Sequence, residues 1–180
     1  MALSKITNGG VAASGIPSGG IIQVQHTQLT TDSTLSLSAT TDTVVTGFTV
    51  NITPTSTSST IKCEAMFVGE FGDDAPNTYN HMFFFYRDTT KLGYTGTAGN
   101  RNYGVAPATR TYYAEDQNST LETAYLSFFD SPSTTSQITY KLGVNVELAD
   151  TLYINRTLSA TDSFVHERGT SFICVTEIAG

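Results

Sequence analysis

The residue types that could carry out acid–base or metal chemistry are dispersed along this 180-residue chain. His26, His81 and His166 lie far apart, and none has a spacing such as H-x-x-x-H, which would bring two imidazoles to one metal ion. The sequence also lacks a G-x-S-x-G elbow and a glycine-rich phosphate loop before a helix. We therefore expect no enzymatic activity, no catalytic residues, no bound metal and no cofactor.

Two groups of carboxylates are weaker candidates for a site. Asp73, Asp74 and Asp88 could bind calcium, but the regular ladder of oxygen ligands in an EF-hand loop is missing. The second group could supply the two acids of a glycosidase, and it consists of Glu64, Glu70, Asp130 and Glu147. Acidic proteins often bring two carboxylates close together by chance. We therefore interpret both groups as solvated loop or surface charge.

The composition predicts the elements that must position these side chains. The chain has 31 Thr and 17 Ser, against 9 Lys and Arg and 16 Asp and Glu. Hydroxyl side chains compete with helical backbone hydrogen bonds, and the β-branched Thr suits a strand. A helical protein would normally use Glu, Lys and Arg on its surface, so the composition predicts an all-β protein. The length favours one domain.

Charge and hydropathy exclude two classes of partner. The net charge of -7 argues against nucleic acid, because a phosphate backbone is bound by clustered Lys and Arg. No segment approaches the ~18 consecutive apolar residues of a membrane-spanning helix. The N-terminus has one Lys and no apolar stretch of the kind found in a secretory signal. We expect neither membrane insertion nor a signal peptide.

Alternation of apolar and polar residues predicts three long strands with one buried face each. In residues 43–53 the buried face carries Val44, Phe48, Val50 and Ile52. In residues 59–71 it carries Ile61, Cys63, Ala65, Phe67 and Phe71. In residues 136–148 it carries Ile138, Tyr140, Leu142, Val144, Val146 and Leu148.

Further segments complete a set of about eight principal strands. They are 20–26, 81–87, 121–129, 151–155 and 170–178, with short extra strands near 35–38, 92–95 and 110–113. The segment HMFFFYR at 81–87 is apolar on both faces, so it is either buried on both sides or in contact with another chain. Eight strands with polar turns indicate a sandwich or jelly roll, and we predict an antiparallel eight-stranded jelly-roll sandwich.

Residues 1–20 differ from the rest of the chain. With five Gly and one Pro they have too little apolar surface to fold alone. We predict an N-terminal arm over 1–20, ordered against something else, and a head domain over 21–180. The candidate anchoring residues of the arm are Met1, Leu3, Lys5, Ile6, Val11, Ile16 and Pro17.

Two stretches, FFFYRDTTKLG and LYINRTLSATDSFVHERGTSFICVTEIAG, resemble patterns in small structural proteins of tailed phages of marine bacteria. The shared pattern is an apolar strand ending in Arg-Asp, a polar turn and Leu-Gly, and later Tyr-x-Asn-Arg-Thr before a last strand ending in Glu-Ile. The stretches MALSKI and GIPSGGIIQVQHT resemble the starts of such proteins and of phage fibre heads. The resemblance implies a trimeric jelly-roll head, similar to the tumour-necrosis-factor fold, attached to a virion by a short arm.

The resemblance also implies partners and a location. The chain would form a homotrimer on the virion surface after assembly in the host cytoplasm, and residues 1–20 would contact the major capsid protein or proteins of the tail or portal vertex. Candidate trimer-interface residues are Phe83, Phe85 and Tyr125. Capsid decoration or a head fibre is favoured over a short tail fibre, because a long fibre needs a shaft and none is present.

The same resemblance bears on Cys63 and Cys174, which are too few for a metal site and do not form a CxxC pair. Cys174 replaces the usual Thr, Val, Leu or Met of the last strand. In the tumour-necrosis-factor type of jelly roll, the last strand pairs with the third principal strand, here 59–71. Because Cys174 shares a face with Phe172 and Ile178, we expect both cysteines to face the core as neighbouring reduced thiols.

The long predicted loop 96–120 favours an alternative function. Tyr and Arg are enriched in recognition surfaces. The candidates for contact with a host receptor or surface glycan are Arg101, Tyr103, Arg110, Tyr112 and Tyr113. We favour packing of these Tyr residues against a neighbouring subunit or the sheet. A receptor- or glycan-binding tip of a tail fibre is the alternative, and no pattern in the chain calls for a depolymerase. Arg87, Arg156 and Arg168 are predicted to pair with nearby acids.

Overall fold

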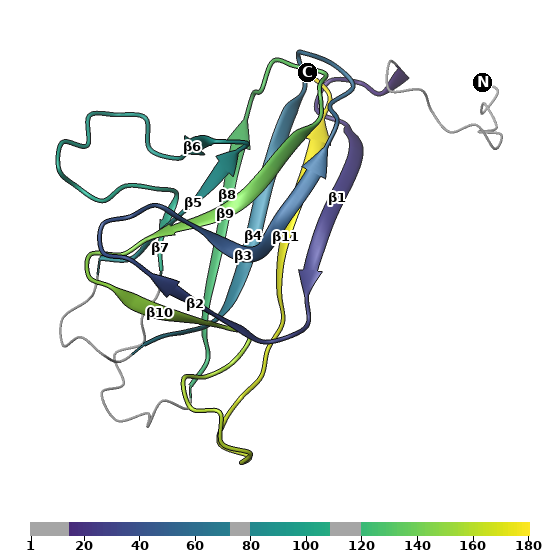
Figure 1. Cartoon of the computed structure of the whole chain (residues 1–180). Coiled ribbons are helices and arrows are strands. Elements are labelled where there is room, and N and C mark those ends of the chain that lie inside the picture. The colour runs from purple at the N-terminus through teal and green to yellow at the C-terminus, as the bar shows by residue number, and fades with distance from the viewer. Residues whose placement is uncertain (1–14, 73–79, 109–119) are drawn as a thin grey trace.

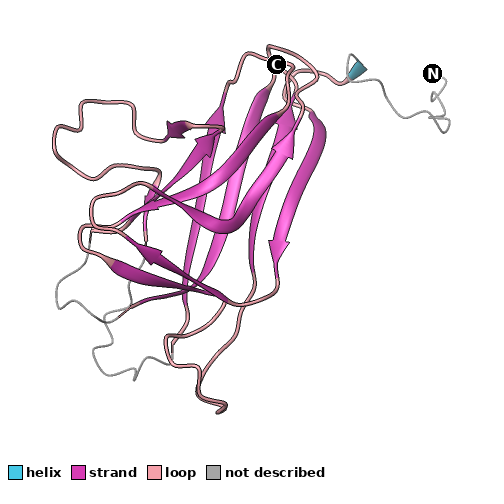
Figure 2. Cartoon of the chain, viewed as in Figure 1, coloured by secondary structure: helices cyan, strands magenta, loops and turns pink. Residues whose placement is uncertain are grey.

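The computed structural model describes residues 15–72, 80–108 and 120–180, which form two antiparallel β-sheets packed face to face (Figure 1). The strands are β1 (Ile21–Leu29), β2 (Ser33–Leu37), β3 (Thr43–Ile52), β4 (Thr60–Phe71), β5 (Met82–Arg87), β6 (Thr90–Leu92), β7 (Ala106–Pro107), β8 (Glu122–Asp130), β9 (Ile138–Asn145), β10 (Asp150–Ile154) and β11 (Ser171–Ile178). Figure 2 shows strands in both layers, with loops joining them at the ends. The predicted all-β sandwich is confirmed. No helix in the described part of the chain is long and apolar enough to span a membrane.

The larger sheet is organised around β4. Its strands run in the order β1-β11-β4-β10-β2, and β8 pairs along the other edge of β4. Cys63 of β4 lies opposite Val175 of β11 on one side and Phe128 of β8 on the other. Where β4 extends past β11, β10 continues the pairing, with Leu152 opposite Phe71. The prediction that the last strand lies beside 59–71 is confirmed.

The smaller sheet has the order β3-β9-β5-β6, and β7 pairs with β5. A two-residue turn joins β5 to β6, since Arg87 lies opposite Thr90. In that turn Asp88 has a φ of 53°, and its carboxylate accepts a hydrogen bond of 2.9 Å from the amide of Thr139 on β9. The hairpin therefore begins earlier than the predicted 92–95 strand. The predicted 110–113 strand lies outside the described residues.

One core fills the space between the sheets. The ring of Phe67 from the larger sheet lies 5.2 Å from that of Phe83 in the smaller one, measured between centroids. Both side chains are almost fully buried, as is Tyr140 of β9. Burying one such side chain contributes roughly 1.5–3 kcal/mol relative to leaving it exposed. The apolar side chains that alternate along the long strands thus form the contact between the two sheets.

Strand β3 departs from strict alternation at Gly47. Val45 is fully buried, whereas Val44 is 38% exposed, so the predicted inward position of Val44 is wrong. The register with β9 shifts between Val44 and Thr49, and Gly47 has a φ of 83°. Glycine adopts this conformation at little cost, and a Cβ there would lie 2.8 Å from Cδ2 of Leu29. The bulge therefore moves the following residues into phase with the core.

The 136–148 prediction also needs correction at its end. Strand β9 ends at Asn145, and although Val146 is still buried, Leu148 is 47% exposed. Residues 146–149 turn the chain toward β10, so the period-two pattern no longer describes which side chains face the core.

Strand β5 is buried on both faces within one chain. Phe83 and Phe85 face the core, and Phe84 on the opposite face is also fully buried. Phe84 lies opposite Gly143 of β9, where the absent side chain leaves room for its ring, and the ammonium of Lys91 covers it at 4.1 Å. Phe83 and Phe85 therefore have no surface left for a second copy, which corrects their assignment as trimer-interface residues.

Asn155, the Asn of the Tyr-x-Asn-Arg-Thr pattern, joins four segments at the lower end of the larger sheet. It is 1% exposed and has a φ of 60°. Its side-chain amide donates to the carbonyls of Leu29 and Thr31, both at 2.9 Å, and its Oδ1 accepts from the hydroxyl of Ser171 at 2.6 Å. Its backbone amide donates to Val68. This residue therefore has a structural role.

The two cysteines lie on neighbouring strands but on opposite faces of the larger sheet. Cys63 is fully buried in the core, and burial raises the pKa of its thiol well above the usual value. Cys174 lies opposite Glu64 and is only half-buried, while Ile173 and Val175 are the inward residues of β11. The prediction that Cys174 faces the core is wrong, because the Phe172 face of β11 is the outer face.

We expect Cys63→Ser to lower the free energy of unfolding by about 1–3 kcal/mol, because it buries a hydroxyl without a guaranteed partner. Cys174→Ser should change it by less than about 0.5 kcal/mol. Urea denaturation of both variants measures the difference. A thiol reagent should modify Cys174 before Cys63 in the native protein, and equal losses of stability in the two variants would contradict the assignment of faces.

Candidate functional site

A cavity of about 980 Å³ opens beside the smaller sheet. Residues that are distant in sequence line it: 40–42, 80–82 and 100–103, together with Lys91, Pro107, Asn145 and Glu147. Residues 100–103 belong to the loop between β6 and β7, which extends to one side of the sheets in Figure 1, away from the two termini. The cavity therefore lies on a part of the head that is far from the arm.

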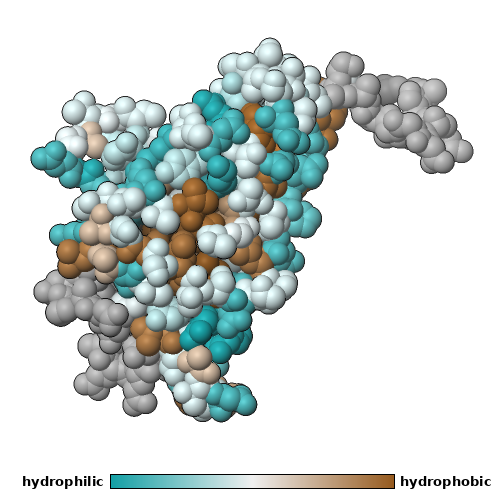
Figure 3. All heavy atoms as spheres, viewed as in Figure 1, coloured by the Kyte–Doolittle hydropathy of each residue, from teal (hydrophilic) through white to brown (hydrophobic). Residues whose placement is uncertain are grey.

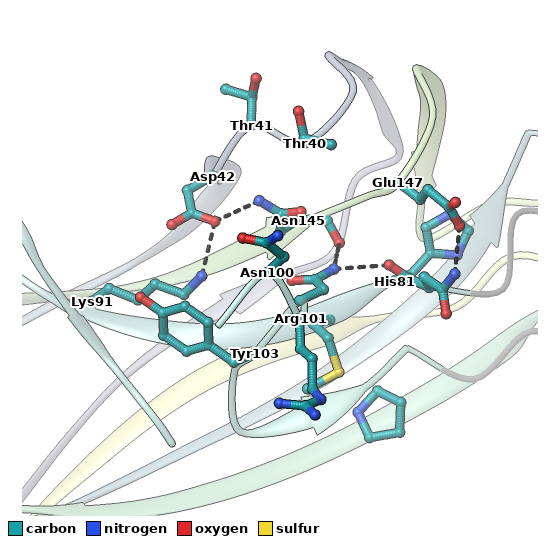
Figure 4. A pocket seen from close by; sticks show the side chains of 14 residues that line it. Thr40, Thr41, Asp42, His81, Lys91, Asn100, Arg101, Tyr103, Asn145 and Glu147 are labelled. Carbon is teal, nitrogen blue, oxygen red and sulfur yellow. Dashed lines mark hydrogen bonds and ion pairs between the residues drawn. The ribbon is translucent and has the colours of Figure 1, made fainter. Parts of the chain in front are cut away.

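Lys91 of β6 is held in the wall of this cavity (Figure 4). Its Nζ lies 2.9 Å from Oδ1 of Asp42, and the side-chain amide of Asn145 donates to the same oxygen at 2.7 Å. The ammonium also lies over two aromatic rings, 4.1 Å from the centroid of Phe84 and 4.2 Å from that of Tyr103. Such contacts hold the ammonium and the two rings in one arrangement. Tyr103 is thereby fixed at the cavity although it is 40% exposed.

Asn102 ties the loop to the end of the sheet. Its side-chain amide donates to the carbonyl of Asn80 at 2.8 Å and to that of Asn145 at 3.3 Å. The side chain of Asn80 in turn donates to the carboxylate of Glu147. These bonds hold three of the segments that line the cavity, 80–82, 100–103 and 145–147, in one arrangement.

His81 lies at the Glu147 end of the cavity in Figure 4. Its side chain is 1% exposed and its ring stacks on Phe71, with centroids 4.2 Å apart. Nε2 lies 3.6 Å from Oδ2 of the buried Asp150, a polar contact slightly longer than a hydrogen bond, and Nδ1 has no hydrogen-bond partner among the described residues. Asp150 is therefore the polar group that faces this imidazole.

The cavity brings together some of the predicted contact residues and not others. Arg101 and Tyr103 line it. Arg110, Tyr112 and Tyr113 lie outside the described residues. Arg101 also donates from Nη1 to the carbonyl of Ala98 at 3.1 Å. Sequence reasoning missed Asp42 and Asn145, because each is a single polar residue at the end of a strand and only the fold places the two side by side.

Asp130, one of the glycosidase candidates, has a structural role. Both of its oxygens accept hydrogen bonds from Nη1 of Arg87, at 3.0 and 3.1 Å, and Oδ2 accepts another from the hydroxyl of Tyr140 at 2.7 Å. Burial and this carboxylate raise the pKa of Tyr140 well above its usual value. The group joins β5, β8 and β9, and Arg87 pairs with an acid as predicted.

The other carboxylate candidates also have partners. Glu64 forms an ion pair of 2.8 Å with Lys62, and the buried Glu70 accepts a hydrogen bond from the backbone of Leu158. Within the described residues, no group of three or more His, Cys, Asp and Glu side chains is arranged to hold a metal ion. Of the calcium candidates, Asp88 forms the β5–β6 turn, while Asp73 and Asp74 lie outside the described residues.

The remaining two arginines lie near the last strands. Arg168 approaches Asp32, with Nε 3.8 Å from Oδ2. Arg156 instead donates to backbone carbonyls, from Nε to Thr157 at 3.0 Å and from Nη2 to Leu158 at 2.9 Å. The prediction of pairing with an acid therefore describes Arg168 and not Arg156.

The outer face of the larger sheet is rich in apolar and aromatic side chains. Tyr125 and Phe129 of β8 are 55% and 59% exposed. By register, the same face carries the partly covered Met66, Phe172, Cys174 and Ile178, and the exposed Val24. On β4 this face carries Lys62 and Glu64, which pair with each other, and toward the other end of the strand the buried Glu70. Tyr125 donates to Glu64, and this bond raises the pKa of Tyr125 to about 12.

The opposite side of the sandwich is more polar. The exposed residues of β3 include Thr46, Thr49 and Asn51. In Figure 3 most of the visible surface is hydrophilic or intermediate, with hydrophobic colour gathered in the middle, where β2 and β3 lie in Figure 1. Near there Leu29 and Leu35 are partly buried against the core.

The end of the N-terminal arm is attached to the end of the last strand. The amide of Gly19 donates to the carbonyl of Ala179 at 2.8 Å, and the amide of Ala179 donates to Gly20 at 2.9 Å. The carbonyl of Pro17 accepts a hydrogen bond of 2.9 Å from the amide of Gly20, which closes a turn. The side chain of Ile16 lies next to Gly20. The other anchoring candidates, Met1, Leu3, Lys5, Ile6 and Val11, lie outside the described residues.

Glu177 is a buried acid that the alternation pattern of the last strand did not single out. It faces inward on β11, is 0% exposed, and accepts hydrogen bonds of 2.6–2.7 Å from Gln23, Ser59 and both the amide and the hydroxyl of Thr55. Burial disfavours its charged form, but these donors outweigh that cost and lower the pKa of Glu177 below its usual value.

The sequence matches no protein-family model and no curated protein. Function is therefore inferred from the geometry of the cavity, the outer sheet face and the arm, together with the resemblance of the quoted segments.

We expect Glu177→Gln to lower the free energy of unfolding near pH 7 by about 1–3 kcal/mol, because charge-assisted hydrogen bonds are lost. The folded-state pKa lies below the unfolded value, so the carboxylate stabilises the fold above the usual pKa of 4.5 and loses this effect as the pH falls through the folded-state pKa. Urea unfolding at a series of pH values should show the gap between the two proteins narrowing below 4.5. A gap that is constant with pH would show that charge is not its cause.

Proposed function

We propose that this chain is a structural protein of a tailed-phage virion, a homotrimeric jelly-roll appendage that docks on the particle through its N-terminal arm. Capsid decoration or a head fibre is the favoured placement, ahead of a short tail fibre. The observation that carries the proposal is the contrast between the apolar outer face of the larger sheet and the polar outer face of the smaller one. The resemblance of the β5–β6 and C-terminal segments to phage structural proteins supports it.

The strand order supports a jelly roll. Strands β1, β11, β4 and β8 lie side by side in one sheet, and β3, β9, β5 and β6 in the other. The chain crosses repeatedly between the sheets, and its first and last strands are neighbours, as expected where Greek-key connections wrap a sandwich. The eight principal strands of the prediction correspond to β1, β3, β4, β5, β8, β9, β10 and β11, and on this interpretation β2, β6 and β7 are short additions.

The outer face of the larger sheet fits a second copy of the same chain. Exposed Tyr125 and Phe129 form part of a broad surface on which Lys62 and Glu64 neutralise each other. Aromatic side chains are enriched and charges depleted in the centre of protein interfaces. An apolar face of this kind seldom stays open to water. The family resemblance implies a homotrimer with three-fold symmetry. In such a trimer each subunit would contribute this face to one of the three interfaces.

The arm leaves the head at the end where the C-terminus lies (Figure 1). Backbone hydrogen bonds at Gly19 and Gly20 hold the last residues of the arm against Ala179. We propose the preceding residues 1–14 as the segment that reaches the particle. On the proposal this segment contacts the major capsid protein or a tail or portal-vertex protein.

A receptor- or glycan-binding tip is the second candidate function. The specific observation in its favour is the cavity lined by Arg101 and Tyr103, which faces away from the arm.

Tyr125→Arg should convert the trimer to a monomer in multi-angle light scattering at micromolar concentration, because it places a cation at the centre of each interface. The fold should persist, since the new guanidinium lies near Glu64 on the outer face. Thr46→Arg, on the outer face of the smaller sheet, is the matched control and should remain trimeric. A monomeric wild-type protein would contradict the proposed assembly.

Removal of residues 1–14 should leave the thermal unfolding midpoint nearly unchanged and abolish incorporation into particles. The described contacts of the arm begin at Ile16 and remain in this variant. Mass spectrometry of purified virions, with full-length protein supplied in parallel as control, measures incorporation. Normal incorporation of the truncated protein would rule out the arm as the anchor.

A further inference from the structure

The cavity beside the smaller sheet is polar but has no net charge. Asp42 and Glu147 contribute two negative charges, and Lys91 and Arg101 contribute two positive ones. Lys91 is already paired with Asp42, so its charge is not available to attract a free anion. The remaining lining consists largely of amide, hydroxyl and aromatic groups. A phosphate or a polyanion would find no excess of cations here.

Several polar groups in the cavity wall are not used by the fold. Oδ1 of Asp42 accepts two hydrogen bonds, but its Oδ2 has no partner among the described residues, and neither do the side chain of Asn100 and the hydroxyl of Tyr103. Asn100 is exposed at the rim. Together these groups present both donors and acceptors toward the open space.

His81 also lines the cavity, but both of its ring nitrogens are buried, and Nε2 lies 3.6 Å from Oδ2 of the buried Asp150. The imidazole therefore belongs to the cavity wall, and the polar groups open to a ligand are those of Asp42, Asn100 and Tyr103.

From these observations we propose that the cavity binds a neutral saccharide. A sugar ring carries hydroxyls that donate and accept at once, which matches the mixed amide, carboxylate and hydroxyl lining. Its C–H face is weakly positive and suits the negative face of an aromatic ring, here Tyr103, whose position Lys91 and Asp42 fix in advance. Preorganisation of this kind lowers the entropic cost of binding. The volume of about 980 Å³ is large enough for more than one sugar unit.

The inference deepens the second candidate function and does not depend on the virion location or on the trimer. It is tested on the purified full-length protein, so failure of the assembly experiments and failure of this one are distinguishable. The probes are glucose, galactose, mannose, N-acetylglucosamine and their common disaccharides, titrated by isothermal calorimetry and by amide chemical shifts. Sialic acid and inorganic phosphate are the charged comparisons.

At least one neutral saccharide should bind saturably with a Kd on the order of 1 mM or below, and shift amides in residues 40–42, 80–82, 100–103 and 145–147. Tyr103→Ala and Asn100→Ala should each weaken it at least tenfold. Tyr94→Ala is the matched control, because Tyr94 is an exposed aromatic residue of the same loop that does not line the cavity. The saccharide affinity of this variant should stay within twofold of that of the wild type. Thermal unfolding of each variant separates lost binding from lost fold.

Three results would overturn the proposal: no saturable binding of any neutral saccharide, binding that Tyr103→Ala and Asn100→Ala leave intact while both variants stay folded, or tighter binding of phosphate or sialic acid than of every neutral sugar. Shifts confined to the outer face of the larger sheet would likewise exclude the cavity.

Discussion

The hydrogen bonding of β4 along both of its edges is the constraint on which the rest of the structure depends. This strand of 12 residues pairs with β8 on one side and with β11 and then β10 on the other. Residues from four distant parts of the chain are thereby held in one register. Because side chains alternate between faces along a strand, that register decides at once which residues enter the core and which form the outer face. The burial of Cys63 and the half-exposure of Cys174 follow from it.

Buried polar groups close the ends of the sandwich where backbone pairing stops. Glu177 gathers donors from β1 and from the loop before β4, Asn155 joins the ends of β1 and β10 to β4 and β11, and Asp130 joins β8 to the other sheet. Each carboxylate or amide has several partners, which is the condition under which a buried polar group stabilises a fold. The acids that could have suggested catalysis are thus largely occupied by the architecture.

The two sides of the head are suited to different tasks. The larger sheet presents Tyr125 and Phe129 on a face of little net charge, whereas the loop beyond the smaller sheet encloses a polar, charge-balanced cavity. The arm base lies at the end of the head away from that cavity. On the proposed function, the subunit would associate through the larger sheet, attach at the arm base and leave the cavity accessible.

The sequence by itself determined the all-β class, the main strands and most of the inward residues of β4 and β9, because period-two alternation is a local property of the chain. The position of the last strand beside 59–71 was implied by the family resemblance and not by the alternation. Only the tertiary structure decided which residues of β3 face the core, because the bulge at Gly47 places Val45 and not Val44 inward. It also decided that Cys174 lies on the outer face of β11. On these strands the residues of the two faces alternate regularly, and no local feature of the sequence tells which face packs against the other sheet. The cavity likewise could not be predicted, since Asp42, His81, Lys91 and Asn145 meet only when four separate strand ends converge, which is a long-range consequence of pairing and not of any motif.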